Sequence, residues 1–382
     1  MKLHIQDPAD PQAPFLHEKI LELCQGAARG GGAFSFASSD GVNLLMKDDV
    51  FRAFLKGGSF ELVVGVDAIT NEKALATLKQ AAAELPKLDV KVFYHQRPQT
   101  LFHPKFCWFR HGSKNVLLTG SGNLTVRGLR GNWEAFGIGE VGGTGADSLE
   151  TQWAGWRKAH ESRLRSVDDP VVVARAAKNI RLPSSPITPG EESEVEPDLQ
   201  PEQKTQTTPT TTITPTPPVA PATSPAATLA VLLAELPASG DRWKQANFDL
   251  ETFQKFFGAE PGLFRRVVFQ HVNAAGELEA LENRPSVDVK SQNYRFELDA
   301  AAGKPYPTTG RPIGVFIRLA PRTFRYRLLM PSDPDYTIVN AALKSMWKGR
   351  ADRMRRVTTT TDFLAKIWPN SPLWVKPLEI ED

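Results

Sequence analysis

The sequence predicts two folded domains of different class: an α/β domain whose mixed sheet is sandwiched by helices, and a mainly-β C-terminal domain, joined by a long linker. A chain of 382 residues is too long for one ordinary hydrophobic core. A proline- and threonine-rich stretch interrupts it, with strands alternating with helices before the stretch and short strands clustering after it. We place the domains at residues 1–180 and 228–382, and the linker at residues 181–227.

The N-terminal domain shows apolar runs separated by helical patterns. Helices are expected at residues 50–55, 70–85 and 148–163, the second with Thr70 as its N-cap. Strands are expected at residues 33–38, 60–66, 90–94, 105–109, 115–119 and 134–140. This order predicts a mixed sheet.

The linker holds eleven prolines between Leu182 and Ala226, together with an acidic cluster and almost no large apolar residue. Such a segment cannot bury enough surface to offset its ordering entropy. Its Thr-Pro and Pro-Pro steps favour a semi-stiff extended spacer.

The C-terminal domain begins and ends with predicted helices, at residues 228–236, 249–257 and 339–347. Short runs rich in β-branched or aromatic residues predict strands at residues 267–272, 287–289, 294–298, 313–319 and 324–329. Strands of this length, separated by turn signals, indicate a barrel or sandwich.

The composition is that of a soluble globular protein, with 41% hydrophobic and 23% charged residues. No apolar run approaches the ~20 residues that span a bilayer, so no membrane partner is expected. The segment 1–14 lacks the basic-then-apolar pattern of a secretion signal. Two cysteines, Cys24 and Cys107, cannot make a disulfide framework, which favours a reducing, cytoplasmic setting.

The formal net charge of +3 hides an asymmetry. Residues 1–180 carry 22 Lys and Arg against 19 Asp and Glu, and residues 241–382 carry 22 against 17, whereas the stretch between them has 2 against 7. Two basic bodies joined by an acidic linker suit a polyanionic partner.

The chemistry-bearing residues lie between His103 and Glu134. His103 and Lys105 would point to the same face of a strand, so both could reach one anion. Histidine is a capable nucleophile, and a lysine ammonium offsets phosphate charge. Downstream, Ser121 stands in a Gly-Ser-Gly turn that can bind phosphate oxygens, Asn123 adds amide donors, and Glu134 could orient an imidazole.

Each element alone has a structural interpretation. A His-x-Lys pair could be a strand-edge histidine beside a solvated lysine, and glycines before an asparagine could form only a hairpin turn. The ordered set, with Gly128 and Leu129 between the turn and Glu134, is what favours a site.

This ordered set resembles the motif of phospholipase D superfamily nucleases, His-x-Lys followed by Gly-Ser-x-Asn and a downstream acidic residue. The resemblance covers about residues 30–165. It implies that His103 is the nucleophile or the acid, that Lys105, Ser121 and Asn123 bind phosphate, and that Glu134 orients histidine. The family pattern has an Asp where this sequence has Arg110, which argues against the lipid hydrolases and for the nuclease branch.

The chain carries one copy of the motif, whereas the family reaction uses two histidines, one attacking and one protonating the leaving oxygen. The resemblance therefore implies a homodimer through the N-terminal domain, with both copies of His103 facing one phosphate. It also implies a phosphohistidine intermediate and no metal or other cofactor. His103 and Glu134 lack the ligand clustering of a two-metal nuclease.

The C-terminal domain offers two candidate nucleic-acid-binding stretches. One combines Arg242, Lys244, Gln245 and Asn247 with a tryptophan, and the other is the basic segment 344–356. From the second we select Lys348, Arg350 and Arg353. A third stretch at 324–327 alternates rings and arginines, and could equally be a strand with one solvated basic face.

The arrangement is similar to restriction endonucleases that join a phospholipase D-type nuclease to a B3-like pseudobarrel domain. That similarity implies a bacterial, cytoplasmic type II or IIS enzyme that acts on double-stranded DNA. A non-specific nuclease, a phospholipase, and a DNA-binding protein with a decayed site remain alternatives.

Overall fold

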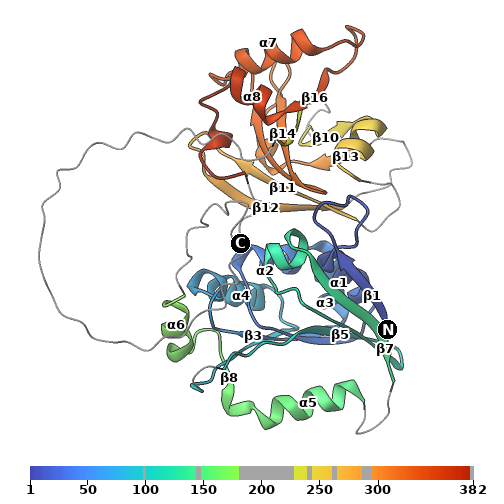
Figure 1. The fold of residues 1–382 in the computed structure, drawn as a ribbon, viewed down its shortest axis with the longest axis vertical. Coiled ribbons are helices and arrows are strands. Elements are labelled where there is room, and N and C mark those ends of the chain that lie inside the picture. The colour runs from blue at the N-terminus through green and yellow to red at the C-terminus, as the bar shows by residue number, and fades with distance from the viewer. Residues whose placement is uncertain are drawn as a thin grey trace, which may run out of the picture.

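The computed structural model describes residues 1–97, 100–142, 148–179, 228–238, 243–259, 265–285 and 294–378. The predicted linker, the predicted strand at 287–289 and Arg242 lie outside these residues. Two units, each built on its own sheet, are stacked on one another (Figure 1). We call residues 1–179 the N-terminal unit and residues 228–378 the C-terminal unit.

The N-terminal unit is built on a mixed sheet, as predicted. The sheet has eight strands in the order β1-β7-β6-β5-β2-β3-β4-β8. β2, β3 and β4 run parallel, and the other neighbours pair antiparallel. The strands are β1 (Lys2–Gln6), β2 (Arg29–Phe34), β3 (Ser59–Gly65), β4 (Leu88–Phe93), β5 (Lys105–His111), β6 (Lys114–Gly120), β7 (Glu134–Val141) and β8 (Leu164–Arg165).

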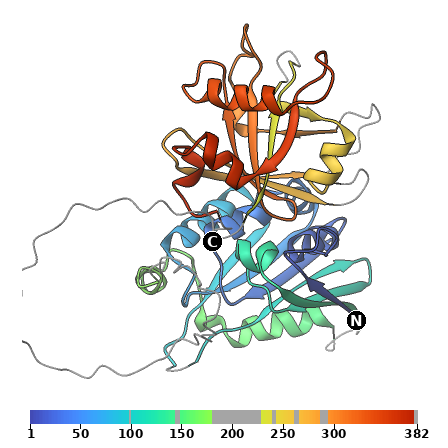
Figure 2. The same ribbon diagram turned by 45° about the horizontal axis from the view of Figure 1, so that its top comes forward.

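Helices cover both faces of this sheet. α1 and α2 lie between the sheet and the C-terminal unit, whereas α5 crosses the opposite face (Figures 1 and 2). The helices are α1 (Leu16–Cys24), α2 (Ser39–Met46), α3 (Asp49–Gly57), α4 (Glu72–Glu84), α5 (Leu149–Ala159) and α6 (Pro170–Ala176), with a π-helical turn at Arg127–Gly131 and a 3-10 turn at Glu161–Arg163.

The start of α4 differs from the prediction. Asn71, rather than Thr70, caps α4 by accepting a hydrogen bond from the Ala74 amide at 3.0 Å. The Thr70 hydroxyl instead accepts from the Ala37 amide, also at 3.0 Å, and so ties the start of α4 to the segment after β2.

Strand alternation divides the apolar residues of the N-terminal sheet into two layers. Cys107 and Phe109 of β5 face the larger core under α1–α4, whereas Trp108 faces a smaller cluster under α5. The larger core also includes Val268 of the C-terminal unit, so apolar packing continues from one unit into the other.

The C-terminal unit contains a six-stranded sheet with the order β12-β11-β15-β14-β9-β16 and a separate β10-β13 pair. Of the described neighbours in the larger sheet, β11 and β15 pair parallel and the rest antiparallel. The strands are β9 (Ala230–Glu235), β10 (Gln245–Phe248), β11 (Arg266–Val272), β12 (Leu278–Pro285), β13 (Tyr294–Glu297), β14 (Ile313–Ala320), β15 (Thr323–Leu329) and β16 (Arg356–Thr360).

Short helical elements complete the C-terminal unit, and a ring cluster fills one face of its sheet. Phe257, Phe269 and Phe316 lie at the centre of this cluster and are fully buried. The helical elements are a π-helical turn (Thr252–Phe256), a 3-10 turn (Asp299–Ala301), α7 (Tyr336–Met346), α8 (Thr361–Ile367) and a 3-10 turn (Pro372–Trp374).

The predicted helix at residues 228–236 is wrong. This segment forms β9, which lies between β14 and β16. Residues 231–234 are all fully buried, because helices and rings cover both faces of the sheet there. A strand buried on both faces reads as a continuous apolar run, and periodicity alone does not separate such a run from a helix.

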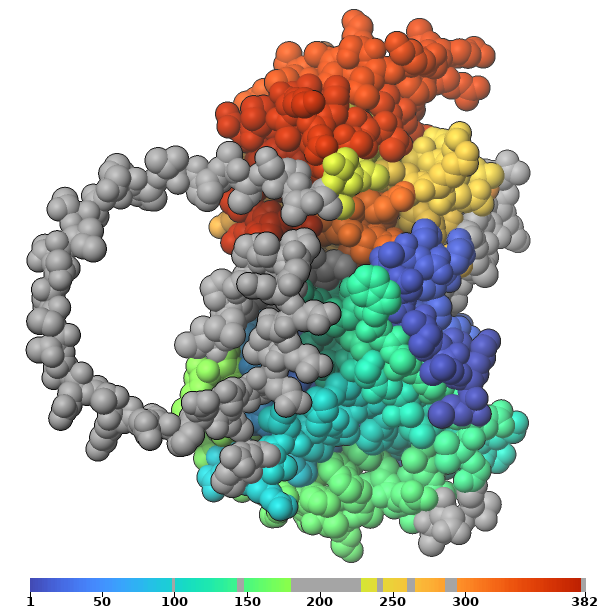
Figure 3. Space-filling model, in the orientation of Figure 1, coloured from blue at the N-terminus to red at the C-terminus, as the bar shows by residue number. Residues whose placement is uncertain are grey.

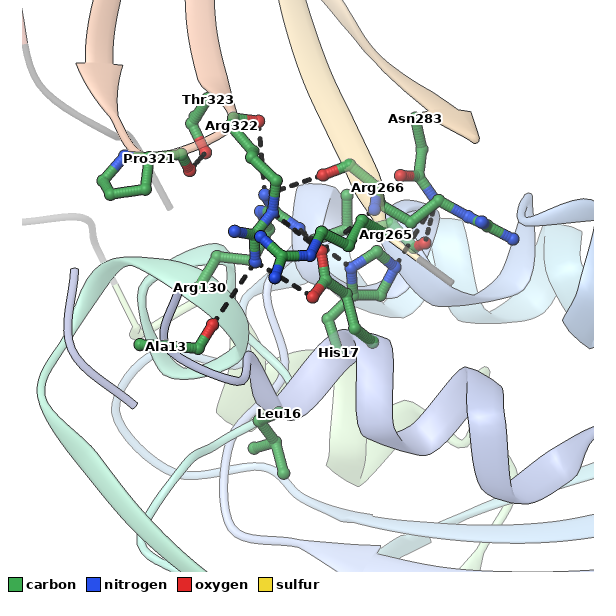
Figure 4. A network of polar contacts seen from close by, with 12 residues as sticks. Ala13, Leu16, His17, Arg130, Arg265, Arg266, Asn283, Pro321, Arg322 and Thr323 are labelled. Carbon is green, nitrogen blue, oxygen red and sulfur yellow. Dashed lines mark hydrogen bonds and ion pairs between the residues drawn. The ribbon is translucent and has the colours of Figure 1, made fainter. Parts of the chain in front are cut away.

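The two units meet through buried ion pairs (Figure 4). The Arg266 Nε lies 2.8 Å from Asp48 Oδ2, and the Arg322 Nη2 lies 3.0 Å from Glu18 Oε2. Arg322 stands in the β14–β15 turn with φ of 54°, a backbone conformation that non-glycine residues rarely adopt. Figure 3 shows the contact in space-filling form: the blue N-terminal segment and the teal segment before β7 both reach the C-terminal unit.

Arg130 links the same interface to the segment between Ser121 and Glu134. It donates to the carbonyl oxygens of Arg266 and Arg322, each at 3.2 Å, and it is fully buried. Its guanidinium and that of Arg322 both lie over the Phe15 ring, at 4.5 and 4.4 Å. The C-terminal unit therefore rests directly on the chain segment that carries half of the predicted site.

Candidate active site

His103 and Lys105 lie together at the end of the sheet where β2 ends and β5 begins. The Lys105 Nζ is 2.9 Å from His103 Nε2, and it donates to the Ser35 hydroxyl at 3.0 Å. Register pairing of Phe34 with Lys105 brings Ser35 to this position. The His103 ring also meets Phe36 edge-on, with centroids 5.9 Å apart.

The surroundings favour the neutral form of the His103 imidazole. Partial burial, and then the charge of Lys105, lower the pKa of His103 from its usual value. Burial also lowers the pKa of Lys105, and the Glu134 carboxylate opposes that shift. A neutral imidazole keeps a free electron pair on one ring nitrogen, which nucleophilic attack requires.

Ser121 and Glu134 face each other across the opening between β6 and β7. The Ser121 hydroxyl donates to Glu134 Oε2 and accepts from the Ala135 amide at 3.0 Å. The Asn132 side-chain amide donates to Glu134 Oε1 at 3.2 Å. Because β6 and β7 pair up to Gly120, these side chains are fixed at the end of the sheet.

The sheet register brings the two halves of the predicted site to the same end. β5 pairs with β6, and the Thr119 hydroxyl donates to the Lys105 carbonyl at 3.4 Å. The charge of Glu134 acts on Lys105. In this single chain the Glu134 carboxylate accepts hydrogen bonds from Ser121 and Asn132. Its role in orienting His103 therefore stays a prediction.

Asn123 lies in the turn after β6 and is half-buried. Its Oδ1 has no hydrogen-bond partner among the described residues, and a backbone bond from the Leu124 amide to the Phe36 carbonyl at 3.1 Å holds the turn against the end of β2. Gly128 approaches so closely that a Cβ there would lie 2.6 Å from the backbone N and O of Asn123. Close packing against Asn123 therefore explains the glycine of the Gly-Leu element in the motif.

Two residues support the site without having been predicted. The Ser35 hydroxyl accepts a hydrogen bond from the Lys105 ammonium. The Gln6 side-chain amide donates to the carbonyl oxygens of Gly128 and Asn132 at 3.2 and 2.9 Å. Ser35 is a polar residue within an apolar strand run, which is a usable signal. Gln6 gives no local signal, because its partners lie more than 120 positions along the chain.

The predicted nucleic-acid-binding residues occupy two places in the C-terminal unit. Lys244, Gln245 and Asn247 lie in or beside β10, where Gln245 donates to Glu297 at 3.1 Å. Lys348, Arg350 and Arg353 are exposed in the loop between α7 and β16, and Arg350 pairs with Asp352 at 2.8 Å. Their binding role stays a prediction.

Within the described part of the chain, no three His, Cys, Asp or Glu side chains gather as ligands for a metal ion. Cys24 and Cys107 are free and buried there. None of the described helices has the length and apolar character needed to cross a bilayer.

No protein-family model and no curated protein matches the chain. Solved structures resemble parts of it. The phospholipase D family member Nuc from Salmonella typhimurium is 15% identical, covers 43% of this chain and 95% of its own, and has a TM-score of 0.31. NucT from Helicobacter pylori is 12% identical, covers 39% and 88%, and has a TM-score of 0.28. Yeast tyrosyl-DNA phosphodiesterase is 15% identical, covers 47% and 42%, and has a TM-score of 0.28.

Proposed function

We propose that the protein is a phospholipase D-type nuclease that cuts DNA through a phosphohistidine on His103. The observation that carries the proposal is the meeting of two pairs, His103 with Lys105 and Ser121 with Glu134, at one end of one sheet. A nucleophile, a cation and a hydroxyl in one place form a phosphodiester-cleaving set.

The chemistry has two displacement steps. The neutral His103 imidazole attacks phosphorus, a P–N bond forms, and the P–O bond to the leaving strand breaks as that oxygen receives a proton. Water then attacks the phosphohistidine, and the P–N bond breaks to return free imidazole. Lys105 leaves His103 Nε2 for a phosphate oxygen, and the Ser121 hydroxyl and Asn123 amide hold the other oxygens.

The leaving oxygen needs a proton donor, and one chain brings one His103 to this site. We assign the donor to the protonated imidazolium of His103 in a second copy of the chain, related by a two-fold axis, so that one copy of His103 begins the cycle neutral and the other begins it protonated. The second imidazole then takes the proton from the attacking water, so each histidine ends the cycle as it began. Lysine ammonium groups and amides of the two chains stabilise the negative charge of the reacting phosphate. This supports a reaction that proceeds without a metal.

The C-terminal unit supports double-stranded DNA as substrate and a restriction enzyme as the most specific role. Its mainly-β fold carries exposed cations at Lys348, Arg350 and Arg353, which suit phosphate contacts. Gln245 and Asn247 supply amides of the kind that read adenine. We propose that this unit is a B3-like recognition domain and that the dimer cuts beside the sequence it reads.

Plasmid cleavage in EDTA tests the proposal. We expect wild type to relax and linearise supercoiled plasmid, and His103→Ala to lose the activity at unchanged fold by circular dichroism. Equal cleavage by both proteins would remove His103 from the chemistry. DNA binding without turnover by wild type would indicate a decayed site, and release of choline from phosphatidylcholine without DNA cleavage would indicate a phospholipase.

Sequencing the ends of cleaved DNA separates the specific from the general form of the proposal. A restriction enzyme gives ends at a fixed offset from one short sequence. Ends scattered over all sequences would leave a nuclease without a recognition role for the C-terminal unit.

A further inference from the structure

A cavity of about 560 Å³ opens on the α5 side of the N-terminal sheet. Its walls include Phe93, Phe102, Phe106 and two tryptophans of α5, Trp153 and Trp156. None of these residues belongs to the predicted catalytic set.

The wall of this cavity begins one residue away from His103. Phe102 and Pro104, the chain neighbours of His103, both line it. Alternation along the start of β5 explains this, because Lys105 points to the catalytic side while Pro104 and Phe106 point toward α5. A ligand in the cavity therefore shares one short chain segment with the nucleophile.

The aromatic rings that line the cavity stack on one another with nearly parallel planes. Phe102 stacks on Phe93 with centroids 4.3 Å apart at 13°, and Trp156 lies 6.1 Å from Phe102 at 26°. His160 continues the series, 5.0 Å from Trp156 at 29°. Trp156 and Phe102 are only half-buried, so ring surface remains open to a planar ligand.

The charged and titratable groups that line the cavity are all basic: His95, Arg97, His160 and Arg163. Among the described residues, no carboxylate lines it. Asp67 lies behind His95, with its Oδ2 3.8 Å from His95 Nε2. The His95 side chain is 9% exposed and forms part of the cavity wall.

We propose that this cavity binds an unpaired nucleobase of the DNA strand that is being cut. The inference rests on the nuclease function proposed above. Stacked rings suit a base, and the surrounding cations suit the phosphates that flank it. A base held there, with the backbone passing the end of β5, keeps a neighbouring phosphate at His103 and requires that the strand be locally unstacked.

Oligonucleotide binding by the full chain tests the proposal. In EDTA, fluorescence anisotropy compares labelled oligo(dT) of twelve nucleotides with an abasic strand of the same length, using His103→Ala so that cleavage plays no part. We expect oligo(dT) to bind at least tenfold more tightly, a difference of ~1.4 kcal/mol, within the range of one base–ring stack. Trp156→Ala should erase this preference and Trp156→Phe should largely keep it.

Lys158→Ala is the matched control, because Lys158 is an exposed cation of the same helix that does not line the cavity. This variant should retain the preference for oligo(dT), whereas Arg163→Ala should weaken the binding of both oligo(dT) and the abasic strand. Equal binding of oligo(dT) and the abasic strand, or an unchanged preference in Trp156→Ala, would overturn the proposal.

Two other occupants of the cavity would give results that differ from those of a nucleobase. Either result would also overturn the proposal. A synthetic peptide of residues 201–222 that quenches Trp156 fluorescence and competes with oligo(dT) would place the chain's own proline-rich segment in the cavity. A fall from dimer to monomer in Trp156→Ala, by sedimentation, would make the cavity an interface between copies. Base preference without plasmid cleavage would instead retain the binding site and refute the nuclease function.

Discussion

Removing Asp48 should destabilise the protein more than any surface change, because it takes away the buried carboxylate that pairs with the Arg266 guanidinium. The side chains of Asp48 and Arg266 are only 2% and 5% exposed, and their ion pair is 2.8 Å long. Breaking such a pair from one side costs about 3–5 kcal/mol. Asp48 also caps α3 by accepting from the Val50 amide at 2.8 Å, which adds about 1 kcal/mol. We therefore expect Asp48→Ala to lower the free energy of unfolding by about 4–6 kcal/mol.

Urea unfolding followed by tryptophan fluorescence measures this loss. The double variant Asp48→Ala/Arg266→Met should recover part of it, because it removes the buried guanidinium charge together with its carboxylate. Glu251→Ala is the control: its pair with Lys255 is 2.9 Å long but exposed, and such pairs contribute below about 1 kcal/mol. A loss below about 1 kcal/mol in Asp48→Ala, or a double variant no more stable than the single one, would refute a buried ionic interface between the units.

Three further changes test the site and its support. Burial holds the pKa of His17 well below 6.5, so below that pH the unfolded chain binds a proton that the folded chain does not. Stability should therefore fall as pH drops below 6.5, by up to about 1.4 kcal/mol per unit, and His17→Gln should flatten the dependence in urea titrations. Lys105→Met should raise the pKa of His103, read from its NMR signals, and lower plasmid cleavage by about 10²–10³-fold. Gly128→Ala should impair cleavage by displacing Asn123, whereas Gly155→Ala, with open space around it, should not.

The mixed α/β class of the N-terminal unit and the places of most of its strands along the chain could be predicted from local pattern. Strands β3 to β7 lie within a few residues of their predicted places, because each alternates or carries a short apolar run bounded by turn signals. β1 was not predicted, since Lys2–Gln6 is a short polar edge strand whose apolar side chains Leu3 and Ile5 are exposed. Its partner β7 lies more than 120 residues away, and such pairing has no local signature.

The candidate site could be assembled from motif order, but its supports could not. His103, Lys105, Ser121 and Glu134 come together because β5, β6 and β7 are neighbours in the sheet. The roles of Gln6 and Arg130 depend on contacts across the whole chain. Arg130 comes directly after the Gly128-Leu129 element of the motif in the sequence. Nothing in that motif indicates that Arg130 donates to carbonyl oxygens of the C-terminal unit.

Covalent trapping tests the central claim most directly. Wild type is mixed with DNA labelled internally with radioactive phosphate in EDTA, quenched in alkaline detergent within the first turnovers, and separated by electrophoresis. We expect a labelled protein band that is stable to base and lost in mild acid, with the label mapping to His103 and absent from His103→Ala. Cleavage by wild type without any labelled protein, together with equal cleavage by His103→Ala, would contradict the account.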